Sequence, residues 1–341
     1  MDGKKNARGR VTIREMAQRL GVSVASVSYA LNGQPGVGDA TRERVLALAR
    51  ELEWRPSSSA RALSRARTDT VGMVLRRDPE LLGQEPFYMS LLSGVESVLS
   101  EEGQSLMLRM VGREPGRDLE VYRSWSAERR VDGVIVMDQL IDDPRPQLLH
   151  ALRMPFVMHG LRIEPETGRQ VVEDLVTDAC RIVDHLAELG HTDVVDVTGP
   201  LTLVHEVERR DAITARAAER GMRVTVVEGD YTREGAGQLL AEHLAAWPQA
   251  TAIVSSNDVM ALGIISALRA AGRTGMALVS WDDSLLCEIS APSITSLARR
   301  TDEQGMRSAR ILLRAIAGDE DRPEAAIPSE LVVRETSIRA R

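Results

Sequence analysis

Residues 11–33, VTIREMAQRLGVSVASVSYALNG, predict two short helices separated by a glycine turn. Thr12 and Glu15 have the spacing of a capping box, in which each side chain accepts a hydrogen bond from the other residue's backbone amide. Apolar residues follow at helical spacing as far as Leu20. Gly21 then ends the helix, because glycine adopts a left-handed backbone at little cost.

The second half of the stretch predicts another helix, capped by Ser23 and ended by Asn32-Gly33. Its apolar residues Val27, Ala30 and Leu31 are predicted to face inward. The residues predicted to remain outside are Val24, Ala25, Ser28 and Tyr29. Two short helices of this kind form the helix-turn-helix that docks in the DNA major groove. The pattern also fits an ordinary helical hairpin at a domain edge, so the rest of the chain has to decide.

Charge is divided unevenly along the chain, whose formal net charge is -7. Residues 1–67 contain 13 Lys and Arg against 6 Asp and Glu, a net charge of +7, so the remainder carries −14. A basic head on an acidic body indicates that contact with phosphates is confined to the N-terminal part. The basic residues of the first ten positions also fit a solvated, flexible tail.

A third helix is predicted from Asp39 to about Glu53; its predicted buried residues are Val45, Leu46, Leu48, Ala49 and Leu52. Thr41 lies in its first turn, where a hydroxyl and free amides can hold a phosphate. The serines and arginines that follow Pro56 fit either a flexible linker or a segment that folds only against DNA. Leu63 in that segment is either a packing residue or an apolar wedge for the minor groove.

Residues 11–33 and 41–63, together with shorter stretches of the body, resemble the lactose-repressor (LacI/GalR) family of bacterial transcription regulators. The body stretches occur in collinear order: EPFYMSLLSGVE, RRVDGVIV, HLAELGHTDVVDVTGP, SSNDVMALG, WDDS and LVVRETS. The likeness covers roughly residues 11–337. It implies a dimer whose second helices enter successive major grooves of a palindromic operator.

The resemblance implies roles for particular residues. Ser23, Ser28, Asn32 and Thr41 match phosphate-contacting positions, and Val24, Ala25 and Tyr29 match base-reading positions. Ala60 and Leu63 match the hinge helix, in which paired leucines open the centre of the operator. The full set of predicted DNA-contacting residues is Thr12, Ser23, Val24, Ala25, Ser28, Tyr29, Asn32, Thr41, Ala60 and Leu63.

Two positions of the N-terminal part depart from the family pattern. The family commonly has Arg, the usual bidentate reader of guanine, where this chain has Tyr29, and many members have Asn where it has Ser57. Val24 and Ala25 offer no side-chain hydrogen bonds, so Tyr29 is the only hydrogen-bonding side chain of the three base readers. We therefore expect an unusual half-site, with more discrimination arising from DNA deformability at the hinge.

From Thr70 onward, short β-rich runs alternate with helical stretches, which predicts parallel sheets covered on both faces. The predicted strands are VGMVL, SLMLRM, DGVIVM, PFVMHG, VVDVTG, RVTVVEG, AIVSS and MALVSW, and the predicted helices are 88–102, 178–190, 206–220, 232–247 and 258–271. About 270 residues suit two lobes better than one.

The predicted fold is an N-terminal all-α helix-turn-helix domain followed by an α/β two-lobe, periplasmic-binding-protein-like sensor domain with parallel sheets. Its expected parts are a flexible basic tail at 1–10, the DNA-binding domain at 11–56, a hinge segment at 57–69 and an effector-binding and dimerisation domain at 70–341. The resemblance implies three crossovers between the lobes. It places lobe one at about 70–170 and 299–321, and lobe two at about 171–298 and 322–341.

Ligands of open α/β sheets bind beyond the carboxyl ends of the strands, where this chain has many polar residues. The predicted effector-binding residues are Arg76, Asp78, Phe87, Asp138, Arg209, Asn257, Trp281 and Asp282. By resemblance, Asn257 and Asp282 match effector positions, and Phe87 and Tyr88 match an aromatic pair beside the cleft. Asp258 is expected only to cap the helix that follows it. Trp281 fits core packing and stacking on a ligand equally well.

The family's usual sugar contacts are incomplete in this chain. Val207 stands where members usually have Arg, with Arg209 and Arg210 just beyond, and TSLARRT at 295–301 replaces another family stretch. Arg76 and Arg77 would supply charge for an anionic or otherwise atypical effector, although exposed positions for both are slightly favoured. The effector is thus expected to be either sugar-like or atypical and anionic.

The sequence indicates no further chemistry. Cys180 and Cys287 lie far apart, the six histidines form no metal-binding cluster, and no phosphate-binding glycine loop or nucleophile elbow occurs. We therefore expect no cofactor, no metal and no catalytic residue. No signal peptide and no long apolar run is present, which predicts a cytoplasmic protein without membrane contact. The absence of a heptad tail after LVVRETS predicts a dimer rather than a tetramer.

These observations together predict a homodimeric transcription regulator, expected to be a repressor, which is nucleoid-associated when bound to its operator. Its expected partners are double-stranded operator DNA, a small-molecule effector in the inter-lobe cleft and a second copy of the chain. The effector is expected to change lobe closure and thereby the order of the hinge segment. The main alternative is a solute-binding protein of the same two-lobe fold, and an enzyme on this scaffold is a weaker one.

Overall fold

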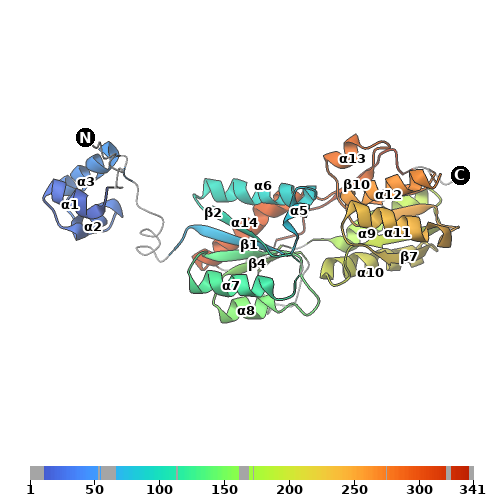
Figure 1. Ribbon diagram of the computed structural model, residues 1–341, viewed down its shortest axis with the longest axis horizontal. Coiled ribbons are helices and arrows are strands. Elements are labelled where there is room, and N and C mark those ends of the chain that lie inside the picture. The colour runs from blue at the N-terminus through green and yellow to red at the C-terminus, as the bar shows by residue number, and fades with distance from the viewer. Residues whose placement is uncertain are drawn as a thin grey trace, which may run out of the picture. The chain divides into compact units, whose positions relative to one another are not determined.

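The computed structural model describes residues 11–52, 54, 67–112, 114–160, 169–171, 173–273, 275–319 and 324–337, without the side chains of residues 80, 81 and 170. Contacts divide the chain into two compact units, residues 1–66 and 67–341 (Figure 1). The predictions for the basic tail, for Ala60 and Leu63 and for most of the hinge segment lie outside the described residues.

The first unit contains three helices, α1 (Ile13–Leu20), α2 (Val24–Leu31) and α3 (Asp39–Glu51). The capping box predicted at the start of α1 is present, since Thr12 N donates to Glu15 Oε2 across 2.7 Å and Glu15 N donates to Thr12 Oγ1. Gly21 ends α1 in the left-handed region, with φ 65°. The predicted helix-turn-helix is therefore confirmed, together with the local chemistry that makes it.

A small apolar core holds the three helices together; its buried members are Met16, Ala17, Val27, Ala30, Val45 and Ala49. One predicted core residue is wrong: Leu46 is 38% exposed, because it lies one position beyond Val45 on the outward side of α3. Leu31, Leu48 and Leu52 are only partly buried against this core. Trp54 closes the unit by donating from Nε1 to the carbonyl of Val11 across 2.6 Å.

The second unit begins with lobe one, a five-stranded sheet in the order β2-β1-β3-β4-β5 with every pair parallel. Its strands are β1 (Thr70–Leu75), β2 (Ser105–Met110), β3 (Gly133–Val136), β4 (Phe156–His159) and β5 (Arg169–Val171). The helices of this lobe are α5 (Pro79–Leu82), α6 (Pro86–Glu101), α7 (Arg117–Ala127), α8 (Arg145–Ala151) and α14 (Thr301–Ala317). Alternate residues of β1 and β3 point to opposite faces, which are covered by α6 and α14 on one side and by α7 and α8 on the other.

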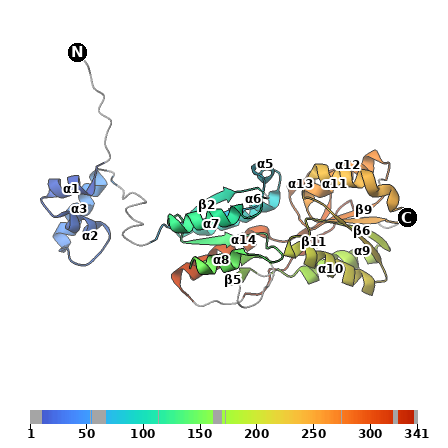
Figure 2. The same cartoon turned by 60° about the horizontal axis from the view of Figure 1, so that its bottom comes forward.

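Lobe two is a six-stranded sheet in the order β11-β10-β9-β8-β6-β7, parallel except for the antiparallel edge strand β11. Its strands are β6 (Asp193–Thr198), β7 (Arg223–Glu228), β8 (Ala252–Ser255), β9 (Ala277–Ser280), β10 (Thr295–Ala298) and β11 (Glu330–Val332). Its helices are α9 (Leu175–Glu188), α10 (Val204–Glu219), α11 (Arg233–His243), the 3-10 helix η2 (Leu244–Ala246), α12 (Asp258–Ala270) and α13 (Leu285–Ile289). Figure 2 shows α9 and α10 on one face of the sheet and α11 and α12 on the other. The predicted two-lobe α/β fold is confirmed.

Backbone hydrogen bonds join the two lobes directly. Leu140, after β3, and Leu203, before α10, form an antiparallel β-bridge. On either side of it, Ile141 N donates to the carbonyl of Thr202 across 3.1 Å, and Val204 N donates to the carbonyl of Gln139 across 2.9 Å. We call these two segments, residues 139–141 and 202–204, the inter-lobe bridge.

Helix α14 lies late in the chain but packs in lobe one, against α6 and strands β3, β4 and β5. Its contact with α6 requires glycine on both helices. A Cβ at Gly94 would lie 1.9 Å from the carbonyl oxygen of Asp302, and one at Gly305 would lie 2.2 Å from that of Leu91. The segments on either side of α14 therefore run from one lobe to the other.

The sequence prediction did not identify β5, β10 and β11. Strands β5 and β11 have only three residues, and β10 (TSLA) has none of the Val or Ile residues that mark the other four-residue strands. Among the described residues, no helix is long and apolar enough to cross a membrane.

Candidate functional site

The outer surface of α2 carries the predicted base-reading residues. Val24 and Tyr29 are 47% and 43% exposed, and Ala25 is also exposed. Ser28 is half-buried, and its Oγ accepts a hydrogen bond from Asn32 Nδ2 across 3.4 Å. Residues three or four positions apart are neighbours on a helix, so Ser28 lies beside both Val24 and Ala25, and Tyr29 lies beside Ala25. These side chains therefore form one contiguous surface.

Two of the predicted DNA-contacting hydroxyls also cap helices. Ser23 Oγ accepts from Ser26 N across 3.0 Å at the start of α2, and Thr12 Oγ1 does the same for α1. Thr41 is different, because the N-cap of α3 is Gly38 and no side chain caps that helix. The first turn of α3 therefore has amides that no side chain of the described residues satisfies, beside the half-buried Thr41.

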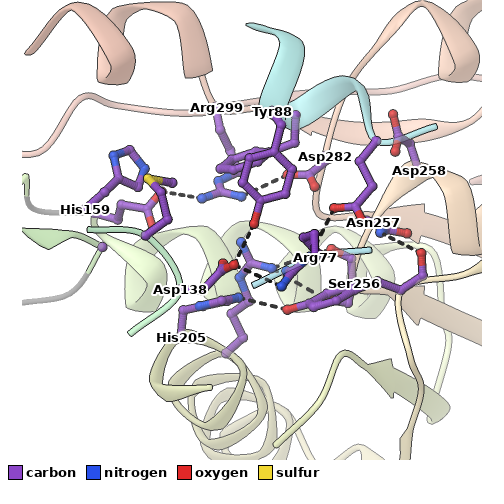
Figure 3. A pocket seen from close by; sticks show the side chains of 17 residues that line it. Arg77, Tyr88, Asp138, His159, His205, Ser256, Asn257, Asp258, Asp282 and Arg299 are labelled. Carbon is purple, nitrogen blue, oxygen red and sulfur yellow. Dashed lines mark hydrogen bonds and ion pairs between the residues drawn. The ribbon is translucent and has the colours of Figure 1, made fainter. Parts of the chain in front are cut away.

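In the second unit, the candidate site is a pocket between the lobes, beyond the carboxyl ends of the parallel strands (Figure 3). Lobe one contributes residues that follow β1, β3 and β4 or begin α6, and lobe two contributes residues that follow β7, β8 and β9 or lie on α10. The polar, charged and aromatic residues that line the pocket are Arg77, Glu85, Phe87, Tyr88, Asp138, His159, Glu173, His205, Arg209, Tyr231, Ser256, Asn257, Asp258, Asp282 and Arg299. The cavity volume is about 60 Å³, enough for a few water molecules.

Arg77 is buried at the centre of the pocket, which corrects the expectation that it is exposed. Its Nη1 lies 2.9 Å from Asp138 Oδ2, and its Nε lies 3.5 Å from Glu85. The guanidinium carbon is 5.4 Å from the ring centre of Tyr88, in lobe one, and 5.2 Å from that of Tyr231, in lobe two. Arg77 is therefore paired within its own lobe and stacked on both.

Asp138 is held as a carboxylate by its neighbours. Tyr88 donates its hydroxyl to Asp138 Oδ2 across 2.6 Å. Burial alone would raise the pKa of Asp138, but the positive charge of Arg77, with smaller contributions from His205 and the Tyr88 hydrogen bond, holds that pKa below its ordinary value.

Arg299 is a second buried arginine, and it lies above the ring of Phe87 with 5.6 Å between guanidinium carbon and ring centre. It donates to Asp282 Oδ1 across 2.8 Å and also pairs with Glu173. Burial opposes ionisation of Glu173, but Arg299, together with His159 and Arg209, more than offsets this and lowers its pKa to about 2. Both acids are therefore already paired with this arginine.

Arg209 is the third buried arginine, and its guanidinium lies 4.7 Å from the ring centre of Trp281. Its Nη1 donates to Glu206 Oε1 across 3.0 Å. Glu206 also accepts from Ser256 Oγ, from the Tyr231 hydroxyl and, through its other oxygen, from the amide of Gly199. Glu206 is thus a buried hub beneath the lobe-two side of the pocket.

The prediction from the sequence that Asp258 only caps the following helix is wrong. Asp258 lines the pocket, and its neighbour Asn257 caps the helix. Asn257 is the N-cap of α12, and its Oδ1 accepts from Met260 N across 2.7 Å. Asp258 is 2% exposed, and its Oδ2 has no hydrogen-bond partner among the described residues. Burial and the neighbouring charge of Asp282 raise the pKa of Asp258 to about 7.

Glu85, at the start of α6, behaves in a similar way. Burial raises its pKa to about 7, although Arg77 acts in the opposite direction. The pocket therefore has two carboxyl groups, those of Glu85 and Asp258, that are half-ionised near neutral pH.

A larger cavity of about 640 Å³ adjoins this pocket and shares Arg77, Asp138 and Tyr231 with it. Its remaining lining is mainly apolar: Leu140, Ile141, Pro200, Leu201 and Leu203, with Thr202 and Arg76. The half-buried Arg76 thus lies at this outer cavity and not in the inner pocket.

The structure brings five of the eight predicted effector-binding residues to the inner pocket, namely Phe87, Asp138, Arg209, Asn257 and Asp282. It does not bring Asp78 there, because that exposed side chain lies by β2, at another surface hollow. Trp281 is 1% exposed and packs in the core of lobe two, where it supports Arg209. Arg210 pairs with Asp211 across 2.6 Å instead of entering the pocket.

Sequence reasoning missed several pocket residues: Glu85, Glu173, His205, Tyr231, Ser256 and Arg299. Glu85 and Arg299 lie in the stretches EPFYMSLLSGVE and TSLARRT. A rule that treats every polar residue after a predicted strand as a candidate would have included Tyr231, but not Arg299, which follows the unpredicted strand β10. Glu173 follows a strand too short to recognise, so no such signal was available for it.

Comparison with known proteins agrees with this division of the chain. Residues 12–57 match the lacI family of bacterial regulatory proteins, and residues 183–337 match a periplasmic binding protein-like domain. The HTH-type transcriptional regulator CelR of Thermobifida fusca is 33% identical over 339 residues, which cover 96% of this chain and 99% of CelR. The HTH-type transcriptional regulator AglR of Rhizobium meliloti (strain 1021) is 30% identical, over 95% of this chain and 93% of AglR.

Solved structures show the same similarity. A complex of the transcriptional regulator CelR with cellobiose has a TM-score of 0.73 at 30% identity, over 96% of this chain and 100% of that one. A lac repressor dimer bound to operator and the anti-inducer ONPF has a TM-score of 0.84, over 97% of this chain and 100% of that one. Its 23% identity makes it evidence for the fold alone.

Proposed function

Because this chain belongs to the LacI family of bacterial transcription regulators, we propose that it binds a palindromic DNA operator as a homodimer and represses transcription. In this proposal residues 1–10 are a basic tail, 11–56 bind DNA, 57–69 form the hinge, and 70–341 bind an effector and dimerise. The protein acts in the cytoplasm and is nucleoid-associated when bound to its operator.

The observation that carries the DNA-binding role is the exposed surface of α2. Val24, Ala25 and Tyr29 are left in solvent by a helix that is otherwise packed, on a unit matched in sequence to a DNA-binding family. Ser23, Ser28, Asn32 and Thr41 have the proposed phosphate-contacting role, and Thr12 is a further proposed DNA contact. Ala60 and Leu63 complete the set in the proposed hinge, with Leu63 as the wedge that opens the operator centre.

The effector role belongs to the inter-lobe pocket and its adjoining outer cavity. Residues from both lobes line both spaces, so a ligand there changes the relative stability of open and closed lobes. The solved complex of CelR with cellobiose supports a sugar-like ligand of two rings. The inner pocket would take the more polar part, and the apolar outer cavity would take the remainder. Phe87, Asp138, Arg209, Asn257 and Asp282 are the proposed contacts, joined by Glu85, Tyr231 and Arg299.

A solute-binding protein of the same two-lobe fold is disfavoured by the N-terminal unit, which such a protein has no use for. An enzyme is disfavoured because the similar proteins compared above are transcription regulators.

The first test is in vitro selection of DNA sites by the purified full-length protein, with no effector added. Enrichment of a palindrome with a flexible central step supports the proposal, and failure to enrich any site contradicts it. Sedimentation of the protein on the selected operator then measures its stoichiometry, for which two chains per site are expected.

The second test measures the affinity for the selected operator by fluorescence anisotropy, with and without cellobiose. A coupling free energy of about 1–3 kcal/mol corresponds to a change of roughly 5–150-fold in operator affinity. The Leu63→Ala variant should lose specific binding while retaining salt-sensitive non-specific binding, because phosphate contacts do not depend on the wedge.

A further inference from the structure

The charges of the inter-lobe pocket do not balance. Its described lining contains three arginines, Arg77, Arg209 and Arg299, and five carboxylic acids, Glu85, Asp138, Glu173, Asp258 and Asp282. Arg209 is further neutralised by Glu206, which lies directly behind it. The formal charge of the arginines and acids that line the pocket is thus negative.

Each arginine is already committed to carboxylates of the protein. Arg77 pairs with Asp138 and Glu85, and Arg299 pairs with Asp282 and Glu173. Both are also stacked on aromatic rings, which fixes their guanidinium planes. An anionic ligand would have to compete with these acids for the same donors and would add negative charge to a negative cavity. The pocket therefore does not favour the anionic effector that Arg76 and Arg77 suggested in the sequence.

The surplus negative charge has a definite location. Asp258 has no arginine or lysine partner among the described ion pairs, and Asp282 adds negative charge beside it. Figure 3 shows Asp258, Asn257 and Asp282 on the same side of the pocket, away from His159. The Asp258 side chain is buried, with only 2% of the residue exposed, and its Oδ2 atom lacks any hydrogen-bond partner among the described residues. A buried carboxylate in this state requires a proton or a donor supplied from outside.

We infer that the effector pocket selects a ligand that carries an ammonium group as well as hydroxyls, an amino sugar in chemical class, with the ammonium at Asp258 and Asp282. The inference rests on the proposed function, because it assumes that this pocket is the effector site. An ammonium supplies several donors and the missing positive charge at once, whereas a hydroxyl supplies a donor alone. A metal ion does not serve instead, since no group of three potential ligands in the described part of the chain has the required arrangement.

The test uses three disaccharides that share one β-1,4-linked glucose skeleton and differ in charge. They are cellobiose, the dimer of β-1,4-linked glucosamine, and cellobiouronic acid. Isothermal titration of the full-length protein at pH 7.5 is expected to give at least tenfold tighter binding of the diamine than of cellobiose, and weaker binding of the acid than of either. In Asp258→Asn the ratio between diamine and cellobiose should fall towards one. Glu85→Gln is the second variant, with a smaller fall expected because Arg77 already neutralises Glu85 in part.

The matched control is Asp78→Asn, which removes an exposed carboxylate outside the pocket and should leave the ratio as in the wild type. The inference is overturned if the acid binds as tightly as cellobiose, if Asp258→Asn keeps the wild-type ratio, or if the diamine binds no better than cellobiose. Binding of none of the three also overturns it. Operator binding, measured on the same preparations, decides separately whether the proposed DNA-binding function stands.

Discussion

The guanidinium carbon of Arg77, in lobe one, lies 5.2 Å from the ring centre of Tyr231, in lobe two. The ring is held in place from its own side, because the Tyr231 hydroxyl donates to Glu206 Oε1 across 2.9 Å. This contact joins the two lobes inside the pocket. A ligand in the pocket would therefore lie beside Arg77 and Tyr231 and would affect the contact between them. Cation–π contacts of this kind contribute about 0.5–2 kcal/mol.

Replacing Tyr231 with leucine should therefore favour the open arrangement of the lobes. The expected change in the ratio of closed to open molecules is roughly 2- to 30-fold, from the loss of the ring alone. Small-angle X-ray scattering of the ligand-free protein should show a larger radius of gyration for Tyr231→Leu. Tyr231→Phe keeps the ring and should stay close to the wild type. Equal scattering from wild type and Tyr231→Leu would show that the contact has no part in closure.

Arg299 should matter for stability far more than the arginine beside it. Its removal in Arg299→Met leaves Glu173 and Asp282 as buried, uncompensated charges, which costs about 3–5 kcal/mol. Arg300→Met removes only an exposed pair with Glu303 and should cost less than about 1 kcal/mol. Urea unfolding followed by circular dichroism measures both variants. A similar loss in the two would mean that burial does not set the strength of these pairs.

The close glycine contact between α6 and α14 predicts that replacing glycine by alanine lowers stability there, whereas the same replacement at a roomier glycine elsewhere does not. Alanine stabilises an exposed helix interior by about 1 kcal/mol relative to glycine, but a Cβ at Gly305 would lie 2.2 Å from the carbonyl of Leu91. Gly305→Ala should therefore lower the melting temperature, with a net cost of about 1–3 kcal/mol. Gly237→Ala, whose Cβ would be 3.4 Å from its nearest neighbour, should be neutral or stabilising. Scanning calorimetry distinguishes them, and a neutral Gly305→Ala would refute the close contact.

Asp196, on β6, predicts a pH dependence of stability. It is 2% exposed, and burial together with the charge of Glu206 raises its pKa to about 7 despite the opposing charges of Arg209 and Arg210. An unfolded aspartate titrates near ~4, so between ~4 and ~7 the folded chain holds a proton that the unfolded chain has released. The stability contributed by this group is therefore present at low pH and lost as the pH rises through that window.

The variant Asp196→Asn tests this sign. It should raise the free energy of unfolding at pH 8 relative to the wild type, by up to about 4 kcal/mol, and change it little at pH 4. Asp193→Asn, at the half-buried start of the same strand, removes a carboxyl whose pKa is lowered and should show no such gain. A gain that is the same at both pH values would contradict the assignment to ionisation of Asp196.

On the proposed operator, we expect the Tyr29 hydroxyl to form a hydrogen bond with a base edge and so to discriminate between DNA sequences. Tyr29→Phe removes only the hydroxyl and should weaken binding to the selected site by about 10- to 100-fold, the value of one good base contact. Binding to an unrelated duplex should not change, because it depends on phosphate contacts. Electrophoretic mobility shifts with both duplexes give the two affinities. An equal loss on both duplexes would place Tyr29 on the backbone rather than on a base.

The first unit was predictable in detail because its signals are local. Capping by Thr12 and Ser23, the turn at Gly21 and the exposure of Tyr29 each depend on residues within one or two helical turns. The prediction that Leu46 is buried was wrong because helical periodicity assigns a residue to the buried or the exposed face only to within about one position.

The pocket was predictable only in part, because its chemistry depends on partners far apart in the sequence. The rule that polar residues gather after strands located Asp138, Asn257 and Asp282 correctly. Nothing local showed that Arg77 would be buried between two tyrosines, or that Arg299 would meet Glu173 across 126 positions. Each depends on how the two lobes approach one another.

The inter-lobe bridge holds the lobes through main-chain atoms at Leu140 and Leu203, beside the cavities but without using their polar side chains. Every residue type except proline offers the same amide and carbonyl. Substitutions that retune the pocket for a new ligand therefore leave this connection intact. In evolutionary terms, a change of ligand need not disturb this main-chain part of the connection between the lobes, even where it alters the contact between Arg77 and Tyr231.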